Sequence, residues 1–282
     1  MTEFPLDINQ KYATMMIEND YIRLIMSEYL SSEERQHNIV SLLSRQGRLS
    51  VAEIVEQFRV SEATARRDLE ALAERGKLQR VHGGALPIKQ APPEAPLLQR
   101  EREQFFEKQR IGQAAAALVR DGETIFLASG TTTLEVARNL RARQNLTVIT
   151  NSLPVMNTLA NLPGITLIGL GGLLRQTELS FVGHIAEQAI AELRADKVIL
   201  GVHAFSLEHG LTSDYLPETL TDRAILKIGR EVILVADHSK FETVSTAFVA
   251  PVASIHHLVT DSAVVPEIIS ALRELGMTIT LA

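Results

Sequence analysis

Apolar residues recur at helical spacing three times in the first third of the chain, and each recurrence predicts a helix. The predicted helices cover residues 31–47, 50–58 and 61–76. Each opens at a serine, whose hydroxyl can accept a hydrogen bond from a free amide at the start of a helix. Glu53 follows Ser50 at the spacing of a capping box, and glycines end the first and third helices.

Residues 77–85 alternate apolar and polar side chains and contain the pair Gly83-Gly84, which is the pattern of a β-hairpin. Three helices and a hairpin predict a small independent module, which we assign to residues 31–86. Four prolines then fall between residues 87 and 96, and they predict a stiff, extended linker over residues 87–100.

The remaining chain, residues 101–282, begins with a helical pattern and continues with seven apolar runs separated by helical segments. Continuous apolar strands between helices predict a parallel sheet with helices on both faces. The fold class is therefore α/β, with a mostly parallel sheet in this larger domain. The predicted strands cover residues 124–127, 146–149, 165–168, 197–201, 231–235, 257–260 and 278–281.

Residues 1–30 carry scattered apolar side chains and no strong helix caps. We expect an N-terminal extension here, with Met26 as an alternative native start. The other interpretation is a short dimerisation helix, which would use the apolar residues between Tyr21 and Leu30.

Composition narrows the class of protein. The 282 residues include no cysteine, which excludes disulfides and thiolate metal sites and fits a reducing compartment. No apolar run is long enough to span a bilayer and no secretory signal is present, so we expect a cytoplasmic protein that does not contact membranes. The net charge is −6, yet residues 59–89 hold seven basic and four acidic residues, a local surplus suited to DNA.

The third helix carries the residue types of a DNA-recognition helix. In a helix-turn-helix, the N-terminal residues of the recognition helix reach base edges in the major groove. Arg66 and Arg67 can each form two hydrogen bonds with guanine or an ion pair with a phosphate. Because neighbouring side chains of a helix point about 100° apart, we expect the two arginines to divide these roles. The alternative is an ordinary salt-bridged helix face. The predicted DNA-binding residues are Ser61, Glu62, Thr64, Arg66, Arg67, Arg80, His82 and Gly83.

The segment from Ser129 to Thr133 has the pattern of an anion site. A strand, a glycine turn and a helix start follow one another, and free amides at such a start attract phosphate. The alternative is that Ser129 or Thr131 only caps the helix. Residues after other strands would join the site, because ligands of open α/β sheets bind beyond the carboxyl ends of strands. The predicted effector-binding residues are Ser129, Gly130, Thr131, Thr132, Thr133, Asn151, Ser152, Gly172, Arg175, His203 and Lys240.

Nearly all of residues 33–282 resembles the DeoR family of bacterial transcription regulators. In the first domain the resemblance is carried by Arg35, Ile39, Val60-Ser61, the run from Arg66 to Leu69, and the run from His82 to Ala85. The second domain resembles that family's effector domain, which is similar to ribose-5-phosphate isomerases. The matching segments are Asp121-Gly122, residues 129–133, residues 150–152, Gly171-Gly172 with Arg175, Val182-Gly183, and residues 237–241.

This resemblance implies a repressor of carbohydrate-metabolism genes that binds double-stranded operator DNA and responds to a phosphorylated sugar. It implies that residues 129–133 contact the phosphate with Lys240 nearby, and it implies no catalytic residue, cofactor or metal ion. Because one winged helix gives limited affinity, we expect a homo-oligomer on repeated half-sites.

Two departures from the family pattern concern the effector. Residues 202–206 and Arg223 stand where the family often has glycines and acidic residues. We therefore expect no catalysis and a more anionic effector that contacts His203 or Arg223. Two alternatives stay open: a regulator with a vestigial pocket, and a sugar-phosphate isomerase with an appended module, since carboxylates occur at Glu208, Asp214, Glu218 and Asp222.

Overall fold

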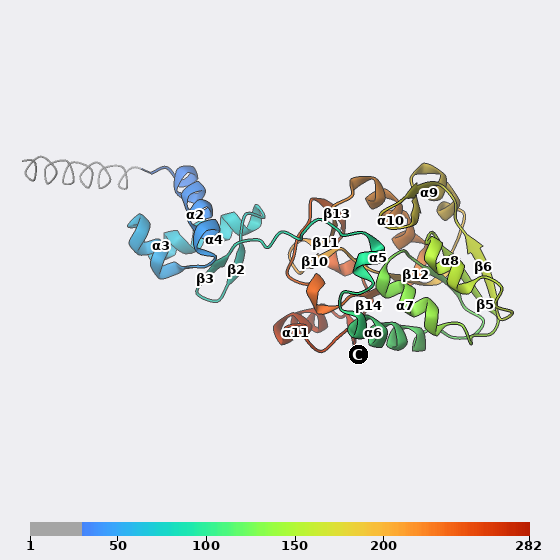
Figure 1. Ribbon diagram of the computed structural model, residues 1–282. Helices are drawn as coiled ribbons and strands as arrows, with labels where there is room; N and C mark the ends of the chain where they lie inside the picture. The colour runs from blue at the N-terminus through green and yellow to red at the C-terminus, as the bar shows by residue number, and fades with distance from the viewer. Residues whose placement is uncertain (1–29) are drawn as a thin grey trace, which may run out of the picture. The chain divides into compact units, whose positions relative to one another are not determined.

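A computed structural model describes residues 30–282 of the chain. Both interpretations of the N-terminal extension therefore fall on residues outside the described part. The chain divides into two compact units, one ending at Ile88 and the other running from Lys89 to Ala282 (Figure 1).

The N-terminal unit contains the three predicted helices, α2 (Ser32–Gln46), α3 (Val51–Phe58) and α4 (Glu62–Glu74). Each begins at the predicted serine, because the side chains of Ser31, Ser50 and Ser61 each accept a hydrogen bond from an amide in the first turn. The apolar faces of the helices pack into one core that includes Ile39 and Leu69.

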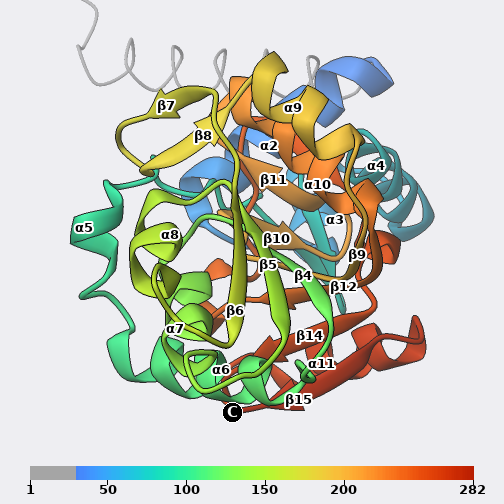
Figure 2. The same cartoon turned by 90° about the vertical axis from the view of Figure 1, so that its right-hand side faces the viewer.

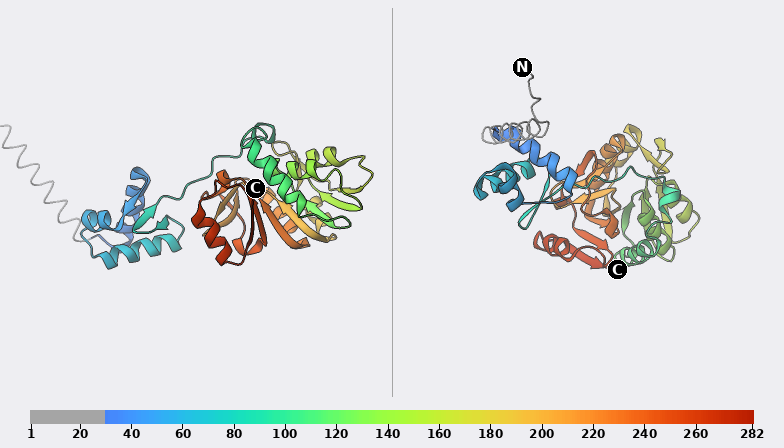
Figure 3. Two further views of the ribbon diagram at one scale, coloured as in Figure 1. Left: turned by 90° about the horizontal axis from the view of Figure 1, so that it is seen from below. Right: turned by 60° about the vertical axis from the view of Figure 1, so that its left-hand side comes forward.

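The predicted hairpin consists of β2 (Gln79–Val81) and β3 (Gly84–Leu86), and the short β1 (Leu49–Ser50) pairs with β3 (Figure 3). Gly83 adopts a φ of +80° in the tight turn between β2 and β3. Gly84 lets β3 approach β1 closely, since a Cβ there would lie 2.3 Å from the carbonyl oxygen of Leu49. This hairpin forms the wing of a winged helix-turn-helix.

Seven parallel strands form the central sheet of the C-terminal unit, in the order β15-β14-β12-β9-β4-β5-β6 (Figure 2). The strands are β4 (Thr124–Leu127), β5 (Leu146–Thr150), β6 (Ile165–Gly169), β9 (Ala195–Leu200), β12 (Gly229–Val235), β14 (His257–Thr260) and β15 (Thr278–Leu281). They coincide with the seven predicted apolar runs to within two residues at each end, and every neighbouring pair is parallel. The α/β fold class is confirmed.

Helices cover both faces of this sheet, which explains why its strands are apolar on both sides. One layer consists of α6 (Phe105–Ala117), α7 (Thr131–Asn139) and α8 (Leu153–Leu159), and the other of α9 (His184–Ala191), α10 (Leu216–Ile228) and α11 (Pro266–Glu274) (Figure 2). Side chains alternate between the two layers along each strand. In β4, Ile125 and Leu127 contact the first layer and Phe126 contacts the second.

Two small antiparallel sheets complete the C-terminal unit, and the sequence pattern did not predict them. One consists of β10 (Ala204–Ser206), β11 (Gly210–Ser213) and β13 (Ala247–Ala250), and the other is the hairpin of β7 (Leu173–Arg175) and β8 (Ser180–Val182). Their strands are three or four residues long, too short for a distinct alternation of side chains. The 3₁₀-helices η1 (His238–Lys240) and η2 (Val252–Ser254) follow β12 and β13.

The segment predicted as a linker over residues 87–100 belongs mostly to the C-terminal unit, and its last residues form the short helix α5 (Leu97–Arg100). The prolines remove some backbone donors, but the amides that remain find acceptors. Ala91 donates to the carbonyl oxygen of Val244 and Leu97 donates to that of Thr177, each at 2.8 Å. The proline pattern does not reveal that this segment is hydrogen-bonded to the C-terminal unit or that it ends in a helix.

Candidate functional site

The central sheet has a topological switch point between β4 and β9. From β4 the chain builds outward through β5 and β6, and it then returns to form β9 on the other side of β4. The loops after β4 and β9 diverge, which opens a crevice at the carboxyl ends of the two strands. A cavity of about 80 Å³ lies there, and residues 128–132 and 200–203 line it.

The N-terminus of α7 faces this cavity without a side-chain cap. Ser129, Gly130, Thr131 and Thr132 line the cavity, and no side chain accepts a hydrogen bond from the first amides of α7. The amide of Leu134 donates to the carbonyl oxygen of Gly130 at 3.0 Å. The amides before it have no acceptor within the helix, so they can donate to an anion. The alternative, that Ser129 or Thr131 only caps the helix, is wrong.

Two further predicted effector residues line the same cavity. Lys240, in η1, forms no ion pair with any residue between 30 and 282. His203 follows β9, and its side chain is only 6% exposed. Neither of its ring nitrogens has a hydrogen-bond partner within the described chain. Buried polar atoms are nearly always paired, so these nitrogens are available to a ligand.

Four predicted effector residues lie outside the cavity lining, namely Thr133, Asn151, Ser152 and Gly172, and the first three have other partners. The hydroxyl of Thr133 donates to the carbonyl oxygen of Gly130 at 2.9 Å. The amide of Asn151 donates to a main-chain carbonyl of β8, and the hydroxyl of Ser152 accepts the amide of a residue in the first turn of α8. Asn151 and Ser152 follow β5, one strand away from the switch point, which explains why they do not reach the cavity.

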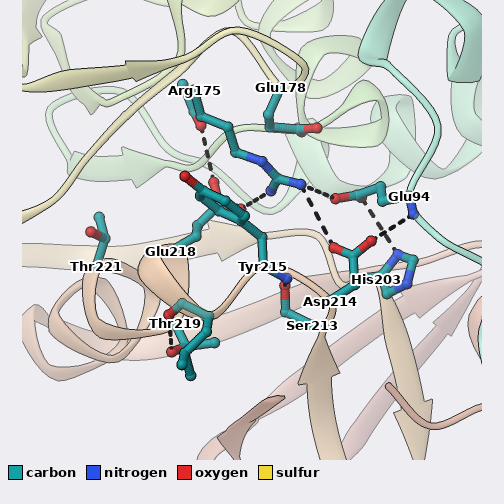
Figure 4. Close-up of polar contacts among 12 residues, drawn as sticks. Glu94, Arg175, Glu178, His203, Ser213, Asp214, Tyr215, Glu218, Thr219 and Thr221 are labelled. Carbon is teal, nitrogen blue, oxygen red and sulfur yellow. Dashed lines mark hydrogen bonds and ion pairs between the residues drawn. The ribbon is translucent and has the colours of Figure 1, made fainter. Parts of the chain in front are cut away.

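Arg175 lies behind the cavity wall, where its guanidinium forms ion pairs with carboxylates (Figure 4). Its guanidinium pairs with Glu218 and, at 3.2 Å, with Glu94, while Asp214 lies 3.7 Å away. Its Cζ atom also lies 4.5 Å from the ring centre of Tyr215. The guanidinium is held by the protein and does not line the cavity, contrary to the expectation that it contacts the effector directly.

The sequence did not point to three charged residues of the opposite wall, Glu94, Arg100 and Glu178, and it offered Glu218 and Asp222 only for the isomerase alternative. The cavity is lined there by Glu94, Arg100, Glu178, Glu218 and Asp222. Glu94 and Arg100 come from the segment predicted as a linker, where no local pattern marks a binding role. Glu218 and Asp222 lie one turn apart on α10, a spacing that places both side chains on one face of the helix.

The cavity shifts the pKa of these carboxyl groups in two directions. Burial raises the pKa of Glu178 to about 8, although Arg100 opposes the shift. Burial also raises the pKa of Glu218 and, together with neighbouring carboxylates, that of Asp222. Burial would raise the pKa of Glu94 as well, but His203, Arg100 and Arg175 lower it to about 2. Shifts of this kind occur in acid–base active sites, and buried ion-pair networks produce them too.

Arg223 does not face the cavity. Its guanidinium donates to the carbonyl oxygens of Phe248 and Val249 in β13. The expectation that Arg223 contacts an effector is wrong, because these carbonyls draw the side chain to the outer side of α10.

The predicted DNA-binding residues lie at the start of α4 and on the wing. The side chains of Arg66, Arg67, Arg80 and His82 are exposed. Arg66 pairs with Glu62 one turn earlier, whereas Arg67 forms no hydrogen bond or ion pair with another described residue.

The next residue of α4, Asp68, has a structural role. It is buried and pairs with Arg35 at 2.5 Å. Gln36 donates a further hydrogen bond to it at 3.0 Å. Asp68 is therefore paired with side chains of α2 and not with Arg67.

Across residues 30–282, no helix is both long and apolar enough to cross a membrane. The same residues contain no cluster of histidines, aspartates and glutamates suited to a metal ion.

A winged helix-turn-helix followed in the same chain by an α/β unit with a cavity at its switch point is the arrangement of a ligand-responsive transcription regulator. Residues 35–91 match the family described as the DeoR-like helix-turn-helix domain. Residues 103–262, more than half of the chain, match the DeoR C terminal sensor domain. The chain belongs to the DeoR family of DNA-binding transcription regulators.

Relatives support this assignment. The chain is 38% identical to the transcriptional repressor AccR of Agrobacterium fabrum over 82% of its own length and 90% of that protein. It is 37% identical to the glycerol-3-phosphate regulon repressor of Escherichia coli, over 75% of its own length and 84% of that protein. These relatives are regulators rather than enzymes, and so is this chain. A ribose 5-phosphate isomerase of Methanocaldococcus jannaschii is 18% identical over 49% of this chain and 55% of that one, with a TM-score of 0.37.

Proposed function

We propose that this regulator is a repressor of carbohydrate-metabolism genes that binds operator DNA and is released or modulated by a phosphorylated sugar or similar metabolite. The observation that carries the effector part is the uncapped N-terminus of α7 at the switch-point cavity. Two relatives are named as repressors, one of them of a glycerol-3-phosphate regulon, and this supports repression rather than activation.

The effector is proposed to place its phosphate at residues 129–132. Free amides, the positive end of the α7 dipole and the unpaired ammonium of Lys240 are all groups that attract an anion. The opposite wall supplies His203 and carboxyl groups, which can exchange hydrogen bonds with the hydroxyl groups of a sugar. This combination favours a ligand that is anionic at one end and rich in hydroxyls at the other.

Operator DNA is proposed to contact the start of α4 through Ser61, Glu62, Thr64, Arg66 and Arg67, and the wing through Arg80, His82 and Gly83. All but Thr64 are exposed, and Arg67 has a free guanidinium. Since one winged helix offers few contacts, the functional form is proposed to be a homo-oligomer on repeated half-sites, in the cytoplasm where operator DNA lies.

Two measurements test this function. The purified full chain is titrated by fluorescence anisotropy against intergenic DNA from around its own gene, at moderate salt. If the chain binds none of these fragments, the proposal that it is a repressor is refuted. A thermal-shift screen with inorganic phosphate and a panel of sugar phosphates then tests the sensor, because a ligand of the folded state raises the melting temperature. If no phosphate compound raises it, the pocket is vestigial and the effector proposal fails.

A further inference from the structure

The segment that follows the DNA-binding unit forms part of the effector cavity. Within residues 89–97, backbone amides anchor it at three points: Ala91 to Val244 and Leu97 to Thr177, each at 2.8 Å, and Glu94 to the carboxylate of Asp214 at 2.7 Å. At the middle anchor, the side chain of Glu94 lines the cavity. A change at Glu94 therefore acts directly on this segment.

The carboxylate of Glu94 lies close to the side chains of Arg100, Arg175 and His203. This carboxylate is 10% exposed, forms an ion pair with Arg100 at 3.1 Å and accepts a hydrogen bond from Arg175 at 3.2 Å. The Nδ1 atom of His203 lies 3.7 Å from it, beyond hydrogen-bonding distance (Figure 4). Arg100 and His203 also line the cavity. An anion that enters the cavity would be attracted to the same two side chains.

We propose that Glu94 acts as an internal competitor of the effector: in the free protein its carboxylate pairs with Arg100 and lies beside His203, and it leaves this position when an anion binds. Two like charges in a buried site repel strongly, so the anion and the Glu94 carboxylate cannot both keep these partners without cost. Displacement of Glu94 loosens the anchored segment at residues 89–97, which is continuous with the DNA-binding unit ending at Ile88. This inference rests on the proposed anion-binding function of the cavity.

The other carboxyl groups of the cavity are less suited to this role. Burial raises the pKa of Glu178, Glu218 and Asp222, so that these groups tend to hold a proton. Glu94 has the opposite shift, to about 2, and is ionised at neutral pH. Glu94 is also the member of this group that lies in the segment leading to the DNA-binding unit.

The first test is the Glu94→Gln variant of the full chain, titrated with inorganic phosphate by calorimetry at neutral pH. The amide keeps the size of the side chain and removes its charge, so phosphate is expected to bind about tenfold more tightly, the effect of about one pKa unit of repulsion. Glu101→Gln is the matched control, because Glu101 lies seven residues away, contacts Arg138 and does not line the cavity. It is expected to bind phosphate like the wild type.

The outcomes distinguish a failure of the competitor role of Glu94 from a failure of the proposed anion site. If both proteins bind phosphate and Glu94→Gln binds it no more tightly than the wild type, Glu94 is not a competitor. If neither protein binds phosphate at millimolar concentrations, the anion site itself is refuted, and the competitor role is refuted with it.

A second measurement uses the wild type and does not depend on the folding of a variant. Hydrogen–deuterium exchange is followed by mass spectrometry with and without saturating phosphate. The amides of Ala91, Glu94 and Leu97 are expected to exchange faster when phosphate is bound, whereas peptides from β5 keep their rate. Unchanged or slower exchange over residues 89–97 would overturn the inference.

Discussion

Helices α4 and α7 begin with similar hydroxyl-rich sequences but meet different surroundings. At the start of α4, the hydroxyl of Ser61 accepts a hydrogen bond from the amide of Thr64 at 3.1 Å, so a side chain caps this helix. At the start of α7, no side chain does this, although Ser129 and three threonines are at hand. The first helix has a side-chain cap, whereas the second has none and begins at a cavity.

This difference separates two ways of binding an anionic partner. Because Ser61 caps α4, we expect binding at its surface to come mainly from side chains such as Arg67, which can form hydrogen bonds with the base edges of DNA. Because the amides of α7 are not engaged, binding there can come from the main chain, which suits a small phosphate. We therefore expect substitutions at the two ends to have separable effects on stability and on binding.

The largest expected effect concerns the carboxyl groups in the cavity that α7 faces. The pKa of Glu178 is about 8 in the folded protein and near its usual value of 4.5 when unfolded. Between these values the folded state holds a proton that the unfolded state has released, so the free energy of unfolding falls as pH rises from about 5 to 8. One proton gives a slope of about 1.4 kcal/mol per pH unit. The lowered pKa of Glu94 acts only below about pH 4.5 and does not disturb this window.

Glu178→Gln should flatten this slope, as measured by urea unfolding with circular dichroism across that pH range. Glu208→Gln, which alters an exposed carboxylate of the β10–β11 turn, should leave the slope unchanged. Equal slopes in Glu178→Gln and the wild type would show that the buried carboxyl does not hold the proton.

The next effect separates two neighbouring hydroxyls of α7. Thr132 lines the cavity, whereas the hydroxyl of Thr133 is bonded to Gly130. Thr132→Val keeps the shape and removes a donor to the anion, so phosphate affinity should fall by about 2 kcal/mol, roughly thirtyfold, while the free energy of unfolding changes little. Thr133→Val should instead lower the free energy of unfolding by about 1 kcal/mol. Calorimetric titration and urea unfolding of both variants check this, and the reverse pattern would contradict the role of Thr132.

A smaller effect is expected at the surface of α4. Arg67→Ala should weaken operator binding about tenfold, since the lost guanidinium has no partner within the described chain and is free to reach DNA. The control is Arg45→Ala, which removes the same charge from an exposed position near the end of α2. Anisotropy titrations at two salt concentrations distinguish them. Equal losses of operator affinity in the two variants would mean that Arg67 contributes only its positive charge and no specific contact with DNA.

The sequence pattern predicts most of the fold because strands buried on both faces and serine-capped helices leave strong local signals. The hydrophobic runs locate every strand of the central sheet, and Ser31, Ser50 and Ser61 locate the helix starts of the first unit. The strands β10, β11 and β13 leave no such signal, since three or four residues do not establish a period.

The candidate site was only partly predictable, and the reason lies in topology. The rule that ligands bind beyond strand ends selects residues 129–132, His203 and Lys240, which all line the cavity. It also selects Asn151 and Gly172, because the sequence does not reveal that only β4 and β9 flank the switch point. Glu94 could not be found at all, since its partner Arg175 is 81 residues away and no local pattern links them.

The smallest expected effect is a difference in the free energy of unfolding when the serine at the start of α4 or of α7 is replaced. Ser61→Ala removes a cap and should lower the free energy of unfolding of the N-terminal unit by about 1 kcal/mol. Ser129→Ala removes a similar hydroxyl from the start of α7, where it caps nothing, and should change the free energy of unfolding by less than about 0.5 kcal/mol while it weakens phosphate binding. Urea unfolding of both variants, with peptide-resolved hydrogen exchange to assign the loss to one unit, measures the difference. A Ser129→Ala protein as destabilised as Ser61→Ala would mean that Ser129 is a cap after all and that the amides of α7 are not free for a ligand.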